Sequence, residues 1–222
     1  MTASQIWARV KLNLNRTDEG IDDRIKEWVN DRQHTICREF NFHFTEIEQE
    51  AETVKNQRSY KFADIAPAYK EELKVDLKTS AGKWLHLKKS EVRDLEQRKQ
   101  FEDTTETGTP THYYVWQDAF YLFPIPDKAY TLNLKYFSYL TDLSAGTDTN
   151  GLTIHYPNVL IYAATGEGFA YFEDNEAMMK YETKYANELR KMISQQVNRS
   201  YANLDLQIKP RTKYESVGYQ GG

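Results

Sequence analysis

Hydrophobic and polar residues change their spacing twice along this chain, and the two changes divide it into three regions. Near the N-terminus, and again after residue 157, apolar residues recur every three to four positions, as they do on an amphipathic helix. From residue 45 to 149 apolar and polar residues alternate in short runs, as they do on half-buried strands. The pattern predicts an α+β protein with an antiparallel β domain inserted into a helical bundle domain.

The N-terminal segment, residues 4–15, fits two patterns. Ile6, Val10 and Leu14 lie four apart, as on a helix, but alternate positions of the same segment are also apolar, as on a strand. Ser4 is a plausible N-cap, so we favour the helix.

Residues 22–40 predict a helix more clearly. Its apolar stripe is interrupted only at Arg32, and acidic residues at its start favour the helix dipole. Cys37 falls beside the stripe, and we expect it to be a buried structural thiol. The stripe consists of Ile21, Ile25, Trp28 or Val29, Ile36 and Phe40.

The most strand-like stretch runs from Gly108 to Leu140 and is rich in aromatic and β-branched residues. Gln117 and Asp118 form a two-residue break, the length of a tight hairpin turn. Further on, Leu132, Leu134, Tyr136 and Ser138 share one face by period two. We predict an antiparallel meander of three consecutive strands at 113–116, 120–123 and 130–139.

Residues 157–173 and 176–197 predict an antiparallel helical hairpin with a break at Asp174. Gly166 and Gly168 lie inside the first of these helices, where each costs about 1 kcal/mol relative to Ala. We expect close helix packing to compensate for that cost.

The last residues, 199–222, have no clear period and too few aliphatic residues for a core. Leu204, Leu206 and Ile208 alternate before Pro210, so this piece could add as a strand to an exposed sheet edge. We predict an extended C-terminal arm that orders on a partner, either a portal protein or a neighbouring copy. The candidate partner-binding residues are Tyr201, Leu206, Ile208, Lys209, Arg211, Lys213, Tyr214 and Tyr219.

The predicted domain boundaries follow from these changes of period. The helical domain comprises residues 1–44 and 150–198, the β domain comprises 45–149, and the arm comprises 199–222.

Composition excludes several classes of protein. The 222 residues include 29 Lys and Arg against 33 Asp and Glu, a net charge of −4, which disfavours tight binding to DNA or RNA. A single cysteine excludes an internal disulfide framework.

No apolar run approaches the roughly 18 residues of a membrane span and no signal pattern is recognisable, so we expect a soluble chain that is not exported by a signal. The 16 tyrosines suit contact surfaces and half-buried strand positions equally.

No catalytic or ligand-binding motif stands out. The five histidines are scattered, and zinc, nucleotide and nucleophile-elbow spacings do not occur. Residues 148–151 match the middle of a calcium loop, but Gly146 and Pro157 stand where the essential carboxylates belong. We therefore predict no metal, no cofactor and no enzymatic activity. A hydrolase with two facing carboxylates is the alternative that sequence alone leaves open.

The order of elements resembles the head-to-tail adaptor proteins, also called connector or ring proteins, of short-tailed bacteriophages. The resemblance covers residues 4–198. The motifs that carry it are Ile21-Asp22-Asp23-Arg24-Ile25-Lys26-Glu27-Trp28-Val29-Asn30, Gly108-x-Pro110-x-x-Tyr113, Leu122-x-Pro124-x-Pro126, Leu134-x-Tyr136-Phe137 with Leu140 and Leu143-Ser144, and Tyr185 with Leu189.

The resemblance implies a virion protein of the head-tail junction, made in the bacterial host cytoplasm and without enzymatic activity. Such adaptors form a ring, usually a dodecamer, beneath the portal protein. The ring extends the channel for DNA ejection and attaches the tail nozzle and fibre proteins. A mildly acidic channel wall agrees with this role, because it lets double-stranded DNA pass without specific binding.

A tail or fibre-attachment module that binds a partner protein or a carbohydrate is the alternative interpretation. The mass of the assembly discriminates between the two. A large ring, or a monomer that assembles only on the portal, favours the adaptor, and a trimer or hexamer favours the tail component.

Overall fold

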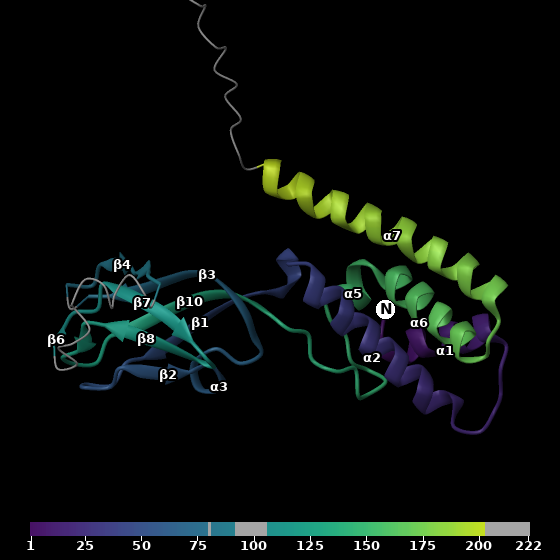
Figure 1. Cartoon of the computed structure of the whole chain (residues 1–222), viewed down its shortest axis with the longest axis horizontal. Helices are drawn as coiled ribbons and strands as arrows, with labels where there is room; N and C mark the ends of the chain where they lie inside the picture. Colours follow the sequence, from purple (N-terminus) through teal and green to yellow (C-terminus); the bar gives the residue numbers. More distant parts are fainter. Residues whose placement is uncertain (80, 92–105, 203–222) are drawn as a thin grey trace, which may run out of the picture.

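The protein has a mixed α+β fold drawn out along one axis, with helices at one end and strands at the other (Figure 1). Its structure is a computed structural model that describes residues 1–79, 81–91 and 106–202, with the backbone alone for 196–202. We call the two ends the helical lobe and the β lobe. The predicted fold class is confirmed.

The helical lobe combines an N-terminal and a C-terminal part of the chain. Its elements are α1 (Ala3–Leu14), α2 (Ile21–Glu39), α5 (Gly151–His155), α6 (Pro157–Tyr171) and α7 (Asn175–Ala202).

Helix α1 settles the ambiguity of the first segment in favour of a helix. It buries Ile6, Val10 and Leu14, which are the three residues four apart. Its N-cap is Thr2 rather than Ser4, and the Thr2 backbone N–H donates to Gln5 Oε1 at 3.0 Å. The N-cap lies two residues earlier than predicted, and Gln5 at the N3 position completes a capping box with Thr2.

Helix α6 packs against α1, α2 and α7, and small residues make this possible. A Cβ on Gly168 would lie 2.8 Å from Leu14 Cδ2 and 3.0 Å from Trp28 Cζ3. A Cβ on Gly166 would lie 2.9 Å from Glu182 Oε1. The expected close packing at these glycines is confirmed.

The helical hairpin of α6 and α7 is also confirmed, with Asp174 Oδ1 accepting a hydrogen bond from Ala177 N at 3.0 Å. Helix α7 continues to Ala202, beyond its predicted end at residue 197. The first part of the predicted arm, including Tyr201, therefore has helical backbone.

The β lobe contains two four-stranded sheets and a two-stranded pair. Sheet A has the order β1-β10-β3-β4, and sheet B has the order β2-β8-β7-β5. The strands are β1 (Glu46–Glu52), β2 (Ser59–Lys61), β3 (Tyr69–Lys78), β4 (Trp84–His86), β5 (Lys88–Lys89), β6 (Thr107–Gly108), β7 (His112–Trp116), β8 (Ala119–Phe123), β9 (Ile125–Pro126) and β10 (Thr131–Ser138), with the short helix α3 (Phe62–Ile65) after β2 and a 3-10 turn (His43–Thr45) before β1.

The predicted three-strand meander is wrong in its last step. Strands β7 and β8 form the expected hairpin around Gln117 and Asp118, but β10 pairs with β1 and β3 in the other sheet. The connection after Phe123 carries Pro124 and Pro126, and β9 within it pairs with β6. It is too long for a tight turn, so the chain crosses to sheet A instead of returning beside β8.

The core of the β lobe lies between the two sheets. Alternate residues of β10, among them Leu132, Leu134 and Tyr136, are buried there, which confirms the predicted face. Aromatic residues of sheet B meet them from the other side, and Phe120 is among the largest fully buried side chains.

The alternating residues 42–48 predict a strand that begins at Phe42, but β1 begins only at Glu46, because His43–Thr45 forms the 3-10 turn. Residues 90–98 predict a short helix with Ser90 as its N-cap, but they lie outside the described residues apart from Ser90 and Glu91.

Candidate functional site

The predicted partner-binding residues lie at the end of the chain, beyond most of what the structure describes. Of Tyr201 the structure describes only the backbone, in the last turn of α7. The other members lie outside the described residues: Leu206, Ile208, Lys209, Arg211, Lys213, Tyr214 and Tyr219. Their role as a docking surface stays a prediction.

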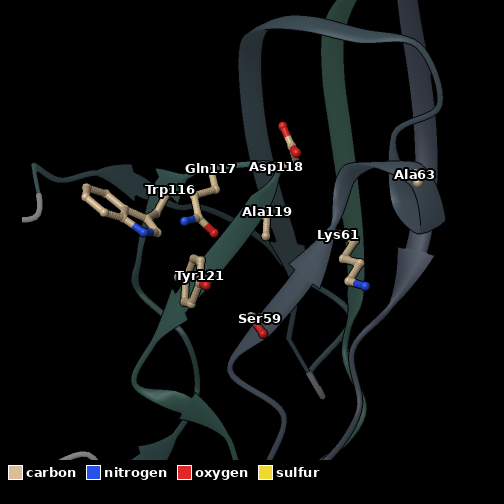
Figure 2. A pocket seen from close by; sticks show the side chains of 8 residues that line it. All are labelled: Ser59, Lys61, Ala63, Trp116, Gln117, Asp118, Ala119 and Tyr121. Atoms are coloured by element: carbon tan, nitrogen blue, oxygen red, sulfur yellow. The ribbon is translucent and has the colours of Figure 1, made fainter.

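A second candidate surface was missed by sequence reasoning. It is a shallow depression of about 400 Å³ on the outer face of sheet B, beside the β7–β8 turn (Figure 2). We call it the sheet B depression. It is lined by Ser59, Lys61, Ala63, Trp116, Gln117, Asp118, Ala119 and Tyr121.

The strand register explains why these side chains meet. Ser59 lies opposite Tyr121, and Lys61 and Trp116 flank Ala119 from the two neighbouring strands. Ala119 is the smallest of these side chains, so the surface is hollowed at its position (Figure 2).

The rim of the depression is aromatic. Trp116 is 53% exposed, and Tyr121 stacks on Tyr114 with ring centroids 4.8 Å apart and planes 14° apart. The guanidinium of Arg58 lies 5.9 Å from the Tyr114 ring centroid. Stacking holds the Tyr121 ring in place, and such rigid aromatic side chains lose little conformational entropy when a partner covers them.

The side chains that line the depression are suited to contacts with a partner. It combines an exposed indole with the hydroxyl of Ser59, the ammonium of Lys61, the amide of Gln117 and one carboxylate, Asp118. A single carboxylate cannot divide general acid and general base work between two groups. The combination of Trp, Tyr and mixed hydrogen-bonding groups is typical of protein–protein interfaces.

A missed signal marks this surface in the sequence. Tyr114 and Trp116 lie on the face of β7 opposite Tyr113 by period two, and of the two only Trp116 is exposed, because Tyr114 is buried. Sequence alone does not reveal that Trp116 is 53% exposed at the end of β7.

Buried ionisable groups elsewhere have structural partners. Burial raises the pKa of the Cys37 thiol to about 11, which confirms an inert buried cysteine. Burial also raises the pKa of Glu72, but hydrogen bonds from Lys89 and Tyr69 outweigh it, so the pKa is lowered overall. Glu72 is therefore held as a carboxylate between its two donors.

Asp148 and Asn150 have structural hydrogen-bond partners. Asp148 Oδ2 accepts from the backbone N–H groups of Ser144 (2.9 Å) and Ala145 (2.7 Å), and Asn150 caps α5. Asn150 also donates to Gln33 Oε1 at 2.8 Å, and so ties this segment to α2.

The described residues contain neither a metal-binding cluster nor a membrane-spanning helix. Among residues 1–79, 81–91 and 106–202, no group of three or more His, Cys, Asp or Glu side chains is arranged to hold a metal ion. Within the same part of the chain, no helix combines the length and apolar character needed to cross a membrane.

The chain matches a family of known proteins. A protein-family model described as SU10 adaptor protein matches residues 1–207, which include both lobes. No curated protein matches the chain.

Proposed function

The chain belongs to the SU10 adaptor protein family and is a structural adaptor of a bacteriophage virion, and we propose that it forms the ring between portal and tail nozzle. In this role about twelve copies lie beneath the portal protein and extend the channel through which DNA leaves the head. The family match across both lobes is the observation that carries the proposal.

The division into two lobes with separate cores supports an adaptor role. One core joins α1, α2, α6 and α7, and the other lies between sheets A and B. An adaptor must contact different proteins above and below it, and two independently packed lobes offer separate surfaces for those contacts (Figure 1). We propose the domain division at residues 44/45 and 149/150 from the change of period. Leu143, which precedes the second boundary, packs in the core of the helical lobe.

The partners of this ring are the portal protein, the tail nozzle and fibre proteins, and neighbouring copies. The C-terminal arm is the proposed docking element toward the portal or a neighbour, because it carries aromatic and cationic residues without a core of its own. The net charge of −4 supports passage of double-stranded DNA without tight binding. No catalytic step is part of the proposal.

The test is the mass of the complex formed with purified portal protein. We expect the full-length chain to bind the portal as a closed ring. The number of its copies should equal the number of portal subunits or stand in a fixed ratio to it. If the chain does not bind the portal and forms a trimer or hexamer by itself, it is a tail component instead.

The sheet B depression favours one alternative function. Its exposed Trp116 and neighbouring polar groups suit a fibre-attachment module that binds a partner protein or a carbohydrate. In an adaptor the same surface would bind the nozzle or fibre protein. The two functions therefore differ in how the copies assemble and not in the chemistry of the sheet B depression.

A further inference from the structure

Among the strands that the structure describes, β1 is the longest edge strand of the two sheets. It has seven residues, whereas the other edge strands β4, β2 and β5 have three, three and two. It pairs with β10 in unbroken register from Glu46 to Glu52, without a bulge, and contains no Pro or Lys. Proteins commonly protect edges by shortening, bulging or interrupting them, and β1 has none of these features.

Every second residue of β1 points its backbone N–H and C=O groups toward the open edge of sheet A, away from β10. The Thr53 N–H, in register after β1, donates to the Tyr130 carbonyl at 2.8 Å. In an antiparallel ladder the bonded positions alternate, so residues 47, 49 and 51 bond to β10 and residues 46, 48, 50 and 52 face the open edge. The Glu50 carbonyl accepts the side-chain amide of Gln49 at 3.0 Å, as expected for an oxygen that no further strand covers.

The outward-facing residues are all glutamates. Glu46, Glu48, Glu50 and Glu52 line one face of β1, and six of its seven residues are exposed. Two such edges repel one another, so copies of the protein do not pair β1 to β1. The same row of carboxylates attracts a strand that carries positive charge. On the opposite face, Ile47 is 39% exposed and offers apolar contact.

Near its C-terminus the sequence contains a segment with the alternation expected of such a strand. In residues 204–208 the apolar Leu204, Leu206 and Ile208 alternate with polar residues, and Lys209, Arg211 and Lys213 follow. With the apolar residues turned toward the Ile47 face, Asp205, Gln207 and Lys209 would turn toward the glutamate row. The three positive charges of Lys209, Arg211 and Lys213 outnumber the single negative charge of Asp205.

The segment cannot reach β1 of its own chain. Only Asn203 separates the end of α7 at Ala202 from Leu204, and one residue spans about 3.5 Å. In Figure 1 the C-terminal end of α7 lies clear of all strands of sheet A. The strand on β1 therefore comes from a second copy.

We propose that residues 204–209 of one copy add as a fifth strand to sheet A of its neighbour, along the open edge of β1. The inference rests on the proposed function, because ring assembly is what brings the segment to a neighbour's edge. It deepens that function by stating how neighbouring copies contact each other, which is by β-strand addition. The glutamate row then selects the segment that can bind at this edge.

Disulfide trapping in the full-length chain tests this contact. Glu48→Cys is combined in turn with Asp205→Cys, Gln207→Cys or Lys209→Cys, since all four side chains lie on one face and the three positions sample three registers. Cys37 stays in place, because its buried thiol has a raised pKa and reacts poorly. We expect at least one pair to give disulfide-linked dimers and higher species at high protein concentration.

A matched pair of variants tests the role of the backbone. Glu50→Pro removes an outward N–H without removing a bond to β10, whereas Glu50→Thr keeps that N–H and removes the same charge. We expect Glu50→Pro to lower the yield of linked chains several-fold below the Glu50→Thr yield. Links within one chain only, no link at any of the three positions, or equal yields from the two variants would overturn the inference.

Binding of the same variants to purified portal protein separates the two claims. Portal binding without cross-links between copies overturns the strand addition and leaves the adaptor proposal standing. Cross-links between copies without portal binding support the strand addition and count against the portal position.

Discussion

Lys70 and Phe40 join the two lobes directly: the ammonium of Lys70, at the start of β3, donates to the Phe40 carbonyl at the end of α2 over 2.8 Å. The same ammonium also donates to the Cys37 carbonyl. These carbonyls belong to the C-terminal turn of α2, where they lack partners within the helix and where the helix dipole favours a cation. A β-strand residue thus caps a helix of the other lobe.

Replacing Lys70 should therefore destabilise the protein. We expect Lys70→Met to lower the free energy of unfolding by about 1–3 kcal/mol, because two backbone acceptors lose a charged donor. Denaturant unfolding followed by circular dichroism measures the change. Lys88→Met, at an exposed position of β5, is the control and should change stability by less than about 0.5 kcal/mol. Equal effects of the two variants would contradict a capping role.

The close approach of α6 to α1 predicts a cost for added volume. Gly168→Ala should destabilise the protein by about 1–3 kcal/mol despite the better helix propensity of Ala, because its Cβ would lie 2.8 Å from Leu14 Cδ2. Leu14→Ala alone should also destabilise, by leaving a cavity. The double variant should lose less stability than the sum of the single variants, since each change accommodates the other. Strict additivity in thermal or denaturant unfolding would show that the two positions do not compete for space.

The carboxylate of Glu72 predicts a pH dependence of stability. Burial opposes its ionisation, but hydrogen bonds from Lys89 and Tyr69 outweigh burial and hold the pKa of Glu72 below its ordinary value. Because the folded pKa lies below the unfolded one, the contribution is fully present above the unfolded pKa, near 4.3, and is lost as the pH falls through the folded pKa. Glu72→Gln should cost about 1–3 kcal/mol at pH 7 and progressively less in more acidic buffer.

The control for this pH series is Glu19→Gln, at an exposed position in the turn before α2. It should leave the unfolding midpoint unchanged at each pH. A Glu72→Gln cost that stays constant from pH 7 to pH 3 would rule out ionisation of Glu72 as its source.

The sheet B depression predicts a variant that binds poorly but folds normally. Trp116→Ala removes a side chain that is 53% exposed, so its melting temperature should match that of the unchanged protein. If the depression holds a nozzle or fibre protein, the dissociation constant should rise at least tenfold, as for an interface hot spot. Trp84→Ala, on sheet A and 47% exposed, is the matched control and should bind normally. Comparable binding by both variants would exclude the depression as the contact.

The helices could be predicted from the sequence because their stripes are local. Ile6, Val10 and Leu14 carry their period within one segment, and the glycines of α6 indicate close packing without reference to a partner. Gln33 shows the limit of this approach. It is fully buried in the α2 stripe, and its side chain is satisfied by Thr141 O and Asn150, both more than a hundred residues away.

Strand pairing was less predictable because it depends on distant segments. Runs of strand-like residues identified β7, β8 and β10, but only the fold decides that β10 lies between β1 and β3. The candidate surfaces follow the same rule. Trp116 and the glutamates of β1 can be recognised as candidate contact residues only when the fold shows which face of sheet B is outward and which edge of sheet A is open.

The central claim is that this adaptor forms a ring between the portal and the tail nozzle, and an image of the native particle tests it most directly. The account predicts a ring of about twelve copies directly beneath the portal, with the DNA channel continuing through it. The chain found instead away from the portal, as a trimer or hexamer within a tail fibre, would contradict the account.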